Sequence, residues 1–297
     1  MRVGLVGAGP WARQVHGPAL AAHPDVELAG VWARRPEVAE ELAGELGTAA
    51  LPDLDALLDA VDAVALAVPP KVQGGLAVRA AAAGKHLICE KPLAEDLDEA
   101  RAVAAAVADA GVLSALVLTL RYDPAVRAWL DGLPAGPPGP DTVGTARWLS
   151  GSLLGGPYAA SAWRAEHGAL LDLGPHVVDL LDAALGPVTG VDWAHHADPD
   201  LWHVGLRHEG GARSTAALSL SFPVDPSEIE LAVFGRGAPG GRHRFSGRVA
   251  SASACYAALL DGLVAAVRGT GPPPALDVAR GLALQEIVDA ARVLAGR

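Results

Sequence analysis

The chain has 297 residues, 51% of them hydrophobic and 19% charged, which is enough for one large or two ordinary domains and excludes intrinsic disorder. Its net charge of −11 argues against nucleic acids and anionic membranes as partners. No apolar run approaches the roughly 20 residues of a membrane span, and the first residues resemble a strand rather than a signal peptide. Cys89 and Cys255 have neither metal-site nor disulfide-framework spacing. We therefore expect a cytoplasmic α/β enzyme or ligand-binding protein.

Residues 1–120 alternate short apolar runs with helical stretches. The pattern predicts strands at 2–6, 26–33, 63–68, 86–89 and 112–120, and helices at 10–23, 36–46, 72–83 and 96–110. The run at 63–68 is apolar throughout, as expected for a strand that is buried on both faces. Such alternation predicts a doubly wound parallel sheet with right-handed crossovers, a Rossmann dinucleotide-binding domain over residues 1–120.

Residues 121–297 follow a different pattern, which begins with a Pro/Gly-rich loop at 133–140. Strands are predicted at 143–152, 188–196, 201–208, 212–222 and 228–234, with turns at 209–211 and 223–226, and helices at 172–185, 253–268 and 279–295. This predicts a second, α+β domain at 121–297 with a mostly antiparallel open sheet. Small and apolar residues on both faces of 216–222 predict a homodimer or homotetramer formed through that sheet.

A glycine-rich turn joins the first predicted strand to the first helix. Residues 7–12 read G-A-G-P-W-A, which matches G-x-G-x-x-G/A with alanine at the third position. Gly7 permits the tight turn, Gly9 leaves room for a pyrophosphate, and Ala12 allows close helix–strand packing. The free N–H groups of the helix N-terminus favour phosphate. This predicts cofactor binding by Gly7, Gly9, Pro10, Trp11 and Ala12; the alternative is a glycine turn that binds nothing.

The end of the second predicted strand indicates which cofactor is bound. NAD sites carry Asp or Glu there for the ribose 2′-hydroxyl, whereas this chain has Ala33 followed by Arg34 and Arg35. A guanidinium suits a 2′-phosphate through paired hydrogen bonds. We therefore expect NADP, with NAD as the alternative, and contacts from Arg34 and Arg35. The other interpretation is an exposed arginine pair at a helix start.

Two later segments carry the chemistry. Residues 84–93, G-K-H-L-I-C-E-K-P-L, contain E-K-P, and residues 168–176, G-A-L-L-D-L-G-P-H, contain D-x-G-x-H. Together with the glycine turn, these motifs resemble the Gfo/Idh/MocA oxidoreductases, the family of glucose–fructose oxidoreductase and inositol dehydrogenase, over the whole chain. The resemblance implies hydride transfer between nicotinamide and a secondary alcohol or ketone carbon of a sugar, cyclitol or nucleotide-sugar. It also implies a cis peptide before Pro92.

The residues of these motifs fit such chemistry. Lys91 follows a buried strand at the carboxyl edge of the sheet, where its ammonium can stabilise a developing alkoxide. Asp172 and His176 are four apart and share a helix face. Because Pro175 is tolerated best in a first turn, the helix is expected to begin near Asp172, which keeps His176 neutral. We expect His176 as acid/base, Asp172 as its orienting group and Lys91 as the polarising group. The alternatives are a surface charge pair of Glu90 and Lys91, an N-cap at Asp172 and an interface histidine at His176.

Further contacts are expected from neighbouring positions. By the same resemblance, Pro69, Glu90 and Lys91 are assigned to the cofactor, and the substrate site is assigned Arg121, Trp163, Arg164 and His167. His167 stands where the family usually shows glycine, and whether it narrows the pocket or adds polarity stays open. The histidines at 195, 196, 203 and 208 lack metal-site spacing, so no metal is predicted. The alternative functions are a ketone or imine reductase of small-molecule biosynthesis, and a non-catalytic NADP-binding sensor on the same fold.

Overall fold

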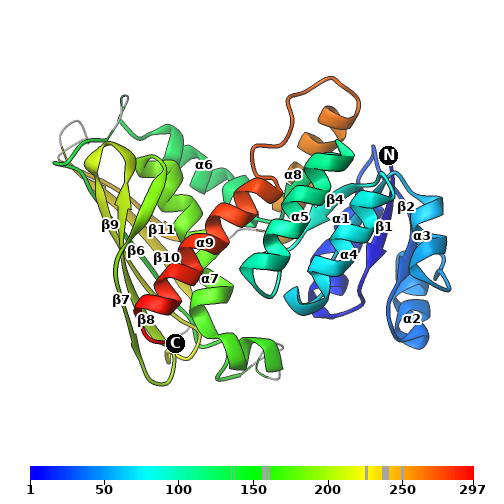
Figure 1. Cartoon of the computed structure of the whole chain (residues 1–297), viewed down its shortest axis with the longest axis horizontal. Coiled ribbons are helices and arrows are strands. Elements are labelled where there is room, and N and C mark those ends of the chain that lie inside the picture. The colour runs from blue at the N-terminus through cyan, green and yellow to red at the C-terminus, as the bar shows by residue number, and fades with distance from the viewer. Residues whose placement is uncertain are drawn as a thin grey trace. The chain divides into compact units, whose positions relative to one another are not determined.

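The chain forms two compact units in the computed structural model (Figure 1), which describes residues 1–134, 136, 138–155, 159, 161–224, 227–235, 241–248 and 251–297. The predicted loop at 133–140 and turn at 223–226 lie partly outside these residues. Unit 1 comprises Met1–Tyr122 and Ser251–Ala283, and unit 2 comprises Asp123–Ala250 and Leu284–Arg297. The predicted boundary after residue 120 between a cofactor domain and a substrate domain stays a prediction, because compactness does not show what each unit binds.

Unit 1 is built on a parallel sheet of order β2-β1-β3-β4-β5, which confirms the predicted doubly wound architecture. Its strands are β1 (Arg2–Val6), β2 (Glu27–Trp32), β3 (Ala63–Leu66), β4 (His86–Cys89) and β5 (Ser114–Leu116). The chain passes from β1 outward to β2 and then returns to the other side of β1 with β3. The carboxyl ends of β1 and β3 therefore flank the switch point, where open α/β sheets bind ligands.

Two helices of unit 1, α3 and α5, begin at aspartate caps, and α2 and α5 end at left-handed glycines. Asp53 and Asp96 accept the backbone N–H of Ala56 and Glu99, and a left-handed glycine follows α2 and α5. The helical segments are η1 (a π-helix, Ala12–His16), α1 (Gly17–Ala22), α2 (Pro36–Leu46), α3 (Leu54–Ala60), α4 (Pro70–Ala82), α5 (Leu97–Ala110), η2 (Thr119–Tyr122), α8 (Ala252–Val267) and the first residues of α9 (Val278–Leu294).

A late segment of the chain completes the core of unit 1. Tyr256, Leu260 and Leu263 of α8 are fully buried in the same apolar cluster as Leu5 of β1 and Leu20 of α1. Burying one large apolar side chain contributes about 1.5–3 kcal/mol. Residues 251–283 are therefore an integral part of the unit that carries the glycine-rich turn.

Unit 2 contains a sheet of order β11-β10-β6-β9-β8-β7, in which β6 and β9 pair in parallel and the other neighbours pair antiparallel. This confirms the prediction of a mostly antiparallel second sheet. The strands are β6 (Val143–Leu149), β7 (Val188–Ala197), β8 (Leu201–His208), β9 (Arg213–Ser219), β10 (Glu228–Phe234) and β11 (Arg242–Gly247). A short 3₁₀ turn, η3 (Glu209–Gly211), joins β8 to β9.

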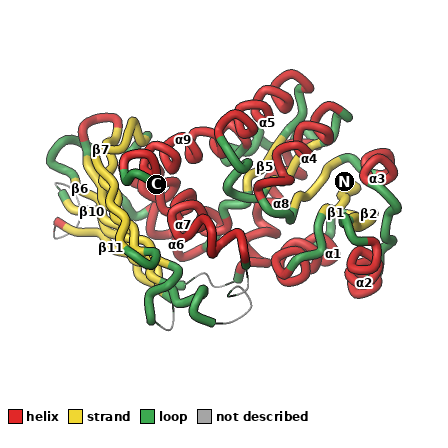
Figure 2. Tube along the Cα trace, turned by 60° about the horizontal axis from the view of Figure 1, so that its bottom comes forward, coloured by secondary structure: helices red, strands yellow, loops and turns green. Residues whose placement is uncertain are grey.

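One face of this sheet is covered by α7 (Ala162–Leu185), as Figures 1 and 2 show. Leu170 of α7, Leu218 of β9 and Val288 of α9 line the same small apolar cavity. The remaining helix of the unit is α6 (Pro124–Asp131). On the opposite face, the indole of Trp193 lies over Gly205, where an added Cβ would come within 2.4 Å of Nε1. Trp193 is 47% exposed, so this face carries an uncovered aromatic side chain.

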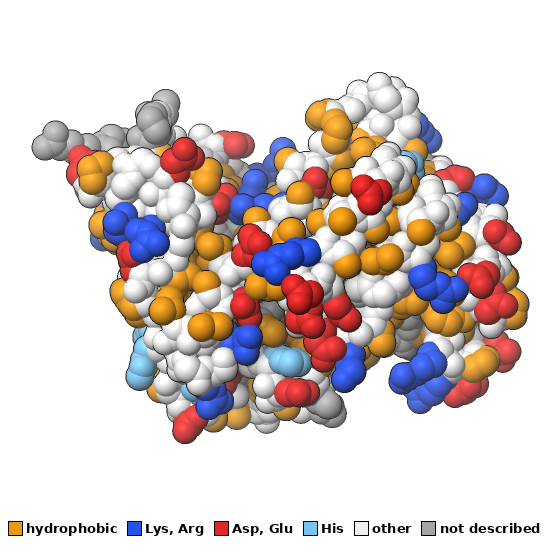
Figure 3. Space-filling view, in the orientation of Figure 1, with side chains coloured by type: hydrophobic (Ala, Val, Ile, Leu, Met, Phe, Trp, Pro, Cys, Tyr) orange, Lys and Arg blue, Asp and Glu red, His pale blue; other side chains and the backbone are white. Residues whose placement is uncertain are grey.

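The described surface is mixed in charge. In Figure 3, Asp and Glu side chains lie among Lys and Arg side chains on the face that is drawn. Within the described ranges, no helix is long and apolar enough to cross a membrane. No group of three His, Cys, Asp or Glu side chains that could hold a metal ion occurs among those residues.

Candidate functional site

The glycine-rich turn lies at the switch point of the unit 1 sheet, and its two glycines differ in their surroundings. Gly7 has φ +109°, and a Cβ there would come within 2.3 Å of the carbonyl oxygen of Ala67, just after β3. The fold itself therefore requires glycine at position 7. An added Cβ at Gly9 would meet nothing within 4 Å. Internal packing does not require glycine at position 9, which leaves open space at the start of the first helix, where a pyrophosphate binds in dinucleotide sites.

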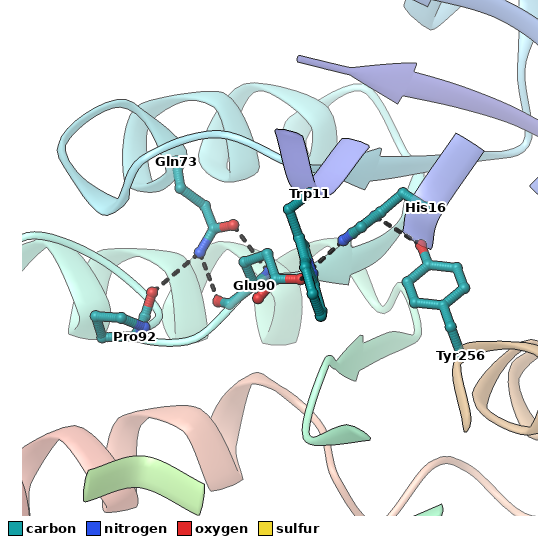
Figure 4. A network of polar contacts seen from close by, with 6 residues as sticks. All are labelled: Trp11, His16, Gln73, Glu90, Pro92 and Tyr256. Carbon is teal, nitrogen blue, oxygen red and sulfur yellow. Dashed lines mark hydrogen bonds and ion pairs between the residues drawn. The ribbon is translucent and has the colours of Figure 1, made fainter. Parts of the chain in front are cut away.

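The first helix begins with a π-turn that brings two polar side chains to one carboxylate. Ala12 is fully buried, as the motif predicts for close packing. Trp11 Nε1 donates to Glu90 Oε1 at 2.7 Å, and His16 Nε2 lies 2.8 Å from the same oxygen. His16 Nδ1 is in turn 2.9 Å from the hydroxyl of Tyr256 on α8 (Figure 4). Single-turn π segments are frequent at functional sites.

The backbone of the E-K-P loop is held by Gln73 of α4, which is fully buried. Its Oε1 accepts the N–H of Glu90 at 2.9 Å, and its Nε2 donates to the carbonyl oxygens of Glu90 and Pro92 at 2.7 and 3.2 Å (Figure 4). The same Nε2 donates to the carbonyl oxygen of Leu93 at 2.9 Å. The peptide between Lys91 and Pro92 is cis, as the resemblance implied. One amide side chain thus fixes the loop on which Lys91 stands.

Other predicted cofactor residues lie at the carboxyl edge of the same sheet. Arg34 and Arg35 follow β2 and are exposed, and neither guanidinium forms a hydrogen bond or ion pair with a described residue. Pro69 is exposed at the N-cap of α4, three residues after the end of β3. Arg121, predicted to bind substrate, belongs to η2 in unit 1.

The D-x-G-x-H segment lies on α7, and its helix begins earlier than predicted. Gly168 (φ +66°, ψ −166°) interrupts α7, and the helical stretch with the motif starts at Ala169 rather than near Asp172. The buried carboxylate of Asp200 accepts the N–H of Ala169 at 2.9 Å and that of Leu220 at 2.8 Å. The start is therefore set by a cap from another segment, and Pro175 lies inside the helix instead of in its first turn.

Asp172 and His176 are largely buried on this helix. Asp172 Oδ2 accepts the Nε–H of Arg164 at 2.8 Å. Arg164, which was predicted to bind substrate, is therefore paired with Asp172, which was predicted to orient His176. His176 is 7% exposed, and its ring lies 5.8 Å from that of Trp148 on β6. The carboxylate of Asp172, one helical turn before His176, is thus paired with a guanidinium.

The remaining predicted substrate residues lie on the first part of α7. The rings of Trp163 and His167 are 5.5 Å apart and tilted, and His167 Nε2 is 3.9 Å from a carboxylate oxygen of Glu166. The structure thus brings Trp11 and Glu90 together in unit 1, and Arg164 and Asp172 together in unit 2. Lys91 belongs to unit 1, whereas His176 belongs to unit 2.

Comparison with known proteins identifies the family. Residues 1–117 match the family described as "Oxidoreductase family, NAD-binding Rossmann fold". Over these residues the chain belongs to the Gfo/Idh/MocA family. This confirms the resemblance that the three motifs indicated, and it places the glycine-rich turn and the E-K-P loop within the matched region.

Relatives of this family member include a dTDP-3,4-didehydro-2,6-dideoxy-alpha-D-glucose 3-reductase of Streptomyces violaceoruber, 35% identical over 193 residues, which are 63% of this chain and 55% of the relative. The chain spans about half the length of the curated relatives that it matches first. Two solved structures share the fold. GenD2 from gentamicin A biosynthesis, in complex with NAD, has a TM-score of 0.84 at 24% identity, and the alignment covers 100% of this chain and 95% of the GenD2 chain. KijD10, a 3-ketoreductase from Actinomadura kijaniata in complex with TDP-benzene and NADP, has a TM-score of 0.74 at 22% identity, and the alignment covers 99% of this chain and 97% of the KijD10 chain.

Four polar residues of this family member were not predicted from the sequence: His16, Gln73, Asp200 and Tyr256. Each acts through a partner far along the chain, and none stands in a motif that marks it. The nearest signal in the sequence is the position of His16, which shares a helix face with the apolar residues Ala12 and Ala19. A histidine buried on such a face requires a polar partner.

Proposed function

We propose that the protein is a nicotinamide-dependent oxidoreductase that interconverts a secondary alcohol and a ketone on a sugar, nucleotide-sugar or cyclitol. The observation that carries this proposal is the G-x-G-x-x-A turn at the switch point, in which glycine at position 9 is unexplained by internal packing. The family, and a relative named as a nucleotide-sugar 3-reductase, support the substrate class.

The chain's own residues have defined roles in the proposed reaction. A nicotinamide cofactor held by the glycine-rich turn at residues 7–12 would supply or accept the hydride at its C4. His176 takes the hydroxyl proton on an imidazole nitrogen during oxidation and returns it during reduction. Asp172, paired with Arg164, orients and electrostatically supports His176. The ammonium of Lys91 stabilises negative charge on the reacting oxygen.

The first experiment asks whether chemistry occurs. The purified protein is incubated with NADP⁺ or NAD⁺ and a panel of sugars, nucleotide-sugars and inositols, and reduced nicotinamide is followed by absorbance. His176→Ala and Lys91→Ala should each lower turnover by about 10²-fold or more. Cofactor affinity of His176→Ala should stay within about two- to threefold, because an acid/base group acts on the substrate. No binding of either reduced cofactor would refute the proposal, and binding without any turnover would favour the sensor.

The proposed cofactor preference is for NADP(H) over NAD(H). Arg34 and Arg35 are exposed and have no partner within the described part of the chain, and Ala33 supplies no carboxylate to repel a 2′-phosphate. One charge-assisted paired contact corresponds to about a 10- to 150-fold preference. The double variant Ala33→Asp with Arg34→Ala should reverse the order of affinity in titrations with NADPH and NADH. Tighter NADH binding by the wild-type protein would refute the preference.

We also propose that two or more copies associate through the outer face of the unit 2 sheet, where Trp193 is exposed. Light scattering at micromolar concentration should give a dimer or tetramer, and a strict monomer would contradict this. The two free, buried cysteines, Cys89 and Cys255, fit the proposed cytoplasmic setting, where thiols stay reduced.

A further inference from the structure

We infer that His16 is a positioning residue for the E-K-P loop: with Tyr256 behind it, His16 holds the carboxylate of Glu90 and so ties the loop that carries Lys91 to the glycine-rich turn. The catalytic consequence rests on the proposed function, since it requires that Lys91 contacts the reacting oxygen. The positioning itself concerns only contacts inside unit 1. The chain of contacts runs Tyr256–His16–Glu90–Trp11 (Figure 4).

The positions of the protons in this chain of contacts follow from the buried hydroxyl of Tyr256. Burial, with the charge of Glu90 adding to it, raises the pKa of the Tyr256 hydroxyl well above its ordinary value, so the hydroxyl stays protonated. It can donate to His16 Nδ1 at 2.9 Å, which leaves the imidazole proton on Nε2, 2.8 Å from Glu90 Oε1. With the proton placed in this way, both ring nitrogens of His16 have a hydrogen-bond partner. Tyr256 thereby sets which nitrogen of His16 faces the carboxylate.

The carboxylate of Glu90 is the side-chain connection between loop and turn. Gln73 already fixes the loop backbone at Glu90, Pro92 and Leu93, but α4 is not part of the glycine-rich turn. Glu90 Oε1 instead reaches Trp11, two residues after Gly9, and His16, on the helix that this turn opens. Loss of the His16 imidazole removes one of two donors to Glu90 and leaves the buried Tyr256 hydroxyl without its acceptor.

A second histidine in the same unit provides a matched control. His23 follows α1, its side chain is 3% exposed, and its Nε2 lies 3.1 Å from Asp261 Oδ1 on α8. It resembles His16 in burial and in its pairing with a carboxylate. In the described part of the chain, its hydrogen-bond partners are Asp261 and the backbone of Asp25, and neither belongs to the glycine-rich turn or the E-K-P loop. A purely structural effect of losing a buried histidine should therefore appear in both variants, whereas a positioning effect should appear only at His16.

The experiment measures hydrogen exchange of the loop amides at 89–94 in the full chain without ligand, and then the Kd of NADPH and NADH. His16→Ala and the milder Tyr256→Phe should each speed loop exchange by about two- to tenfold, the effect of losing one net hydrogen bond. His16→Gln, whose amide can donate to Glu90, should restore most of the slow exchange. The double variant should match His16→Ala alone, because Tyr256 acts through His16. The Kd of the cofactor should rise in the variants with faster loop exchange and should stay near the wild-type value in His16→Gln.

His23→Ala should lower the thermal midpoint without changing loop exchange or cofactor Kd. Unchanged loop exchange in both His16→Ala and Tyr256→Phe, or the same change in His23→Ala, would overturn the inference. If the wild-type protein binds neither cofactor, the proposed function fails, but the exchange comparison still decides whether His16 positions the loop.

Discussion

Asp200 should be among the most sensitive polar positions of unit 2, because a single buried carboxylate satisfies two backbone donors. It is 5% exposed, and its two oxygens accept the N–H groups of Ala169 and Leu220 at 2.9 and 2.8 Å. Asp200→Ala leaves both buried donors unsatisfied, at about 1–3 kcal/mol each, so the free energy of unfolding should fall by about 2–6 kcal/mol. Asp200→Asn keeps one acceptor oxygen and should lose about half as much.

Urea unfolding monitored by tryptophan fluorescence measures this effect, with Glu209→Ala as the control because Glu209 is an exposed acidic residue of the same unit. The control should change the unfolding free energy by less than about 0.5 kcal/mol. Because Asp200 caps the helix that carries Asp172 and His176, turnover should fall with stability. A loss below about 1 kcal/mol in Asp200→Ala would refute the cap as the element that fixes the start of this helix.

Three further outcomes are expected. Gly7→Ala should destabilise the ligand-free protein by about 1–3 kcal/mol, because its Cβ would clash with a carbonyl oxygen. Gly9→Ala should keep the thermal midpoint of the wild-type protein and bind NADPH more weakly. Equal thermal midpoints for the two variants would contradict this distinction. Burial, with the charge of Glu90, raises the pKa of Cys89 to about 12, so a thiol reagent at about pH 8 should label this residue only in denaturant; rapid labelling of native protein would count against this. Burial also lowers the pKa of His208 below 6.5, so its contribution to stability is present above that pH and is lost as the pH falls below it. Unfolding free energy should therefore decline less steeply on acidification in His208→Asn than in wild type, and equal slopes would show that this titration is unimportant.

Local patterns were sufficient for most of unit 1. The turn at residues 7–12, the parallel strands and α2 follow from short-range chemistry: glycine at a positive φ, continuous apolar runs, and proline at a helix start. The short helix α3 was not predicted, although Asp53 as N-cap and Leu54, Leu57 and Leu58 at helical spacing carry a local signal.

Other features depend on partners that the sequence does not reveal. β11 was not predicted because Arg242–Gly247 has little apolar alternation; His243 instead stacks on Trp129 and reaches its carbonyl oxygen at 2.8 Å. The predicted start of the helix with the D-x-G-x-H motif was too late in the sequence, because its cap, Asp200, lies 31 residues from Ala169. His16 and Tyr256 are 240 residues apart, beyond the reach of any periodicity.

The division of unit 1 into two chain segments has a consequence for synthesis on the ribosome. The sheet strands within Met1–Tyr122 emerge first, but Tyr256 and Leu260 of α8, which fill the same core, emerge only after the intervening part of unit 2. At usual translation rates that interval is roughly 6–25 s. During this interval, the nascent sheet exposes an apolar face to chaperones and to neighbouring chains. The hydrogen bond between Tyr256 and His16, which supports Glu90, has not yet formed. Maturation of unit 1 is thereby deferred until nearly the whole polypeptide has been made.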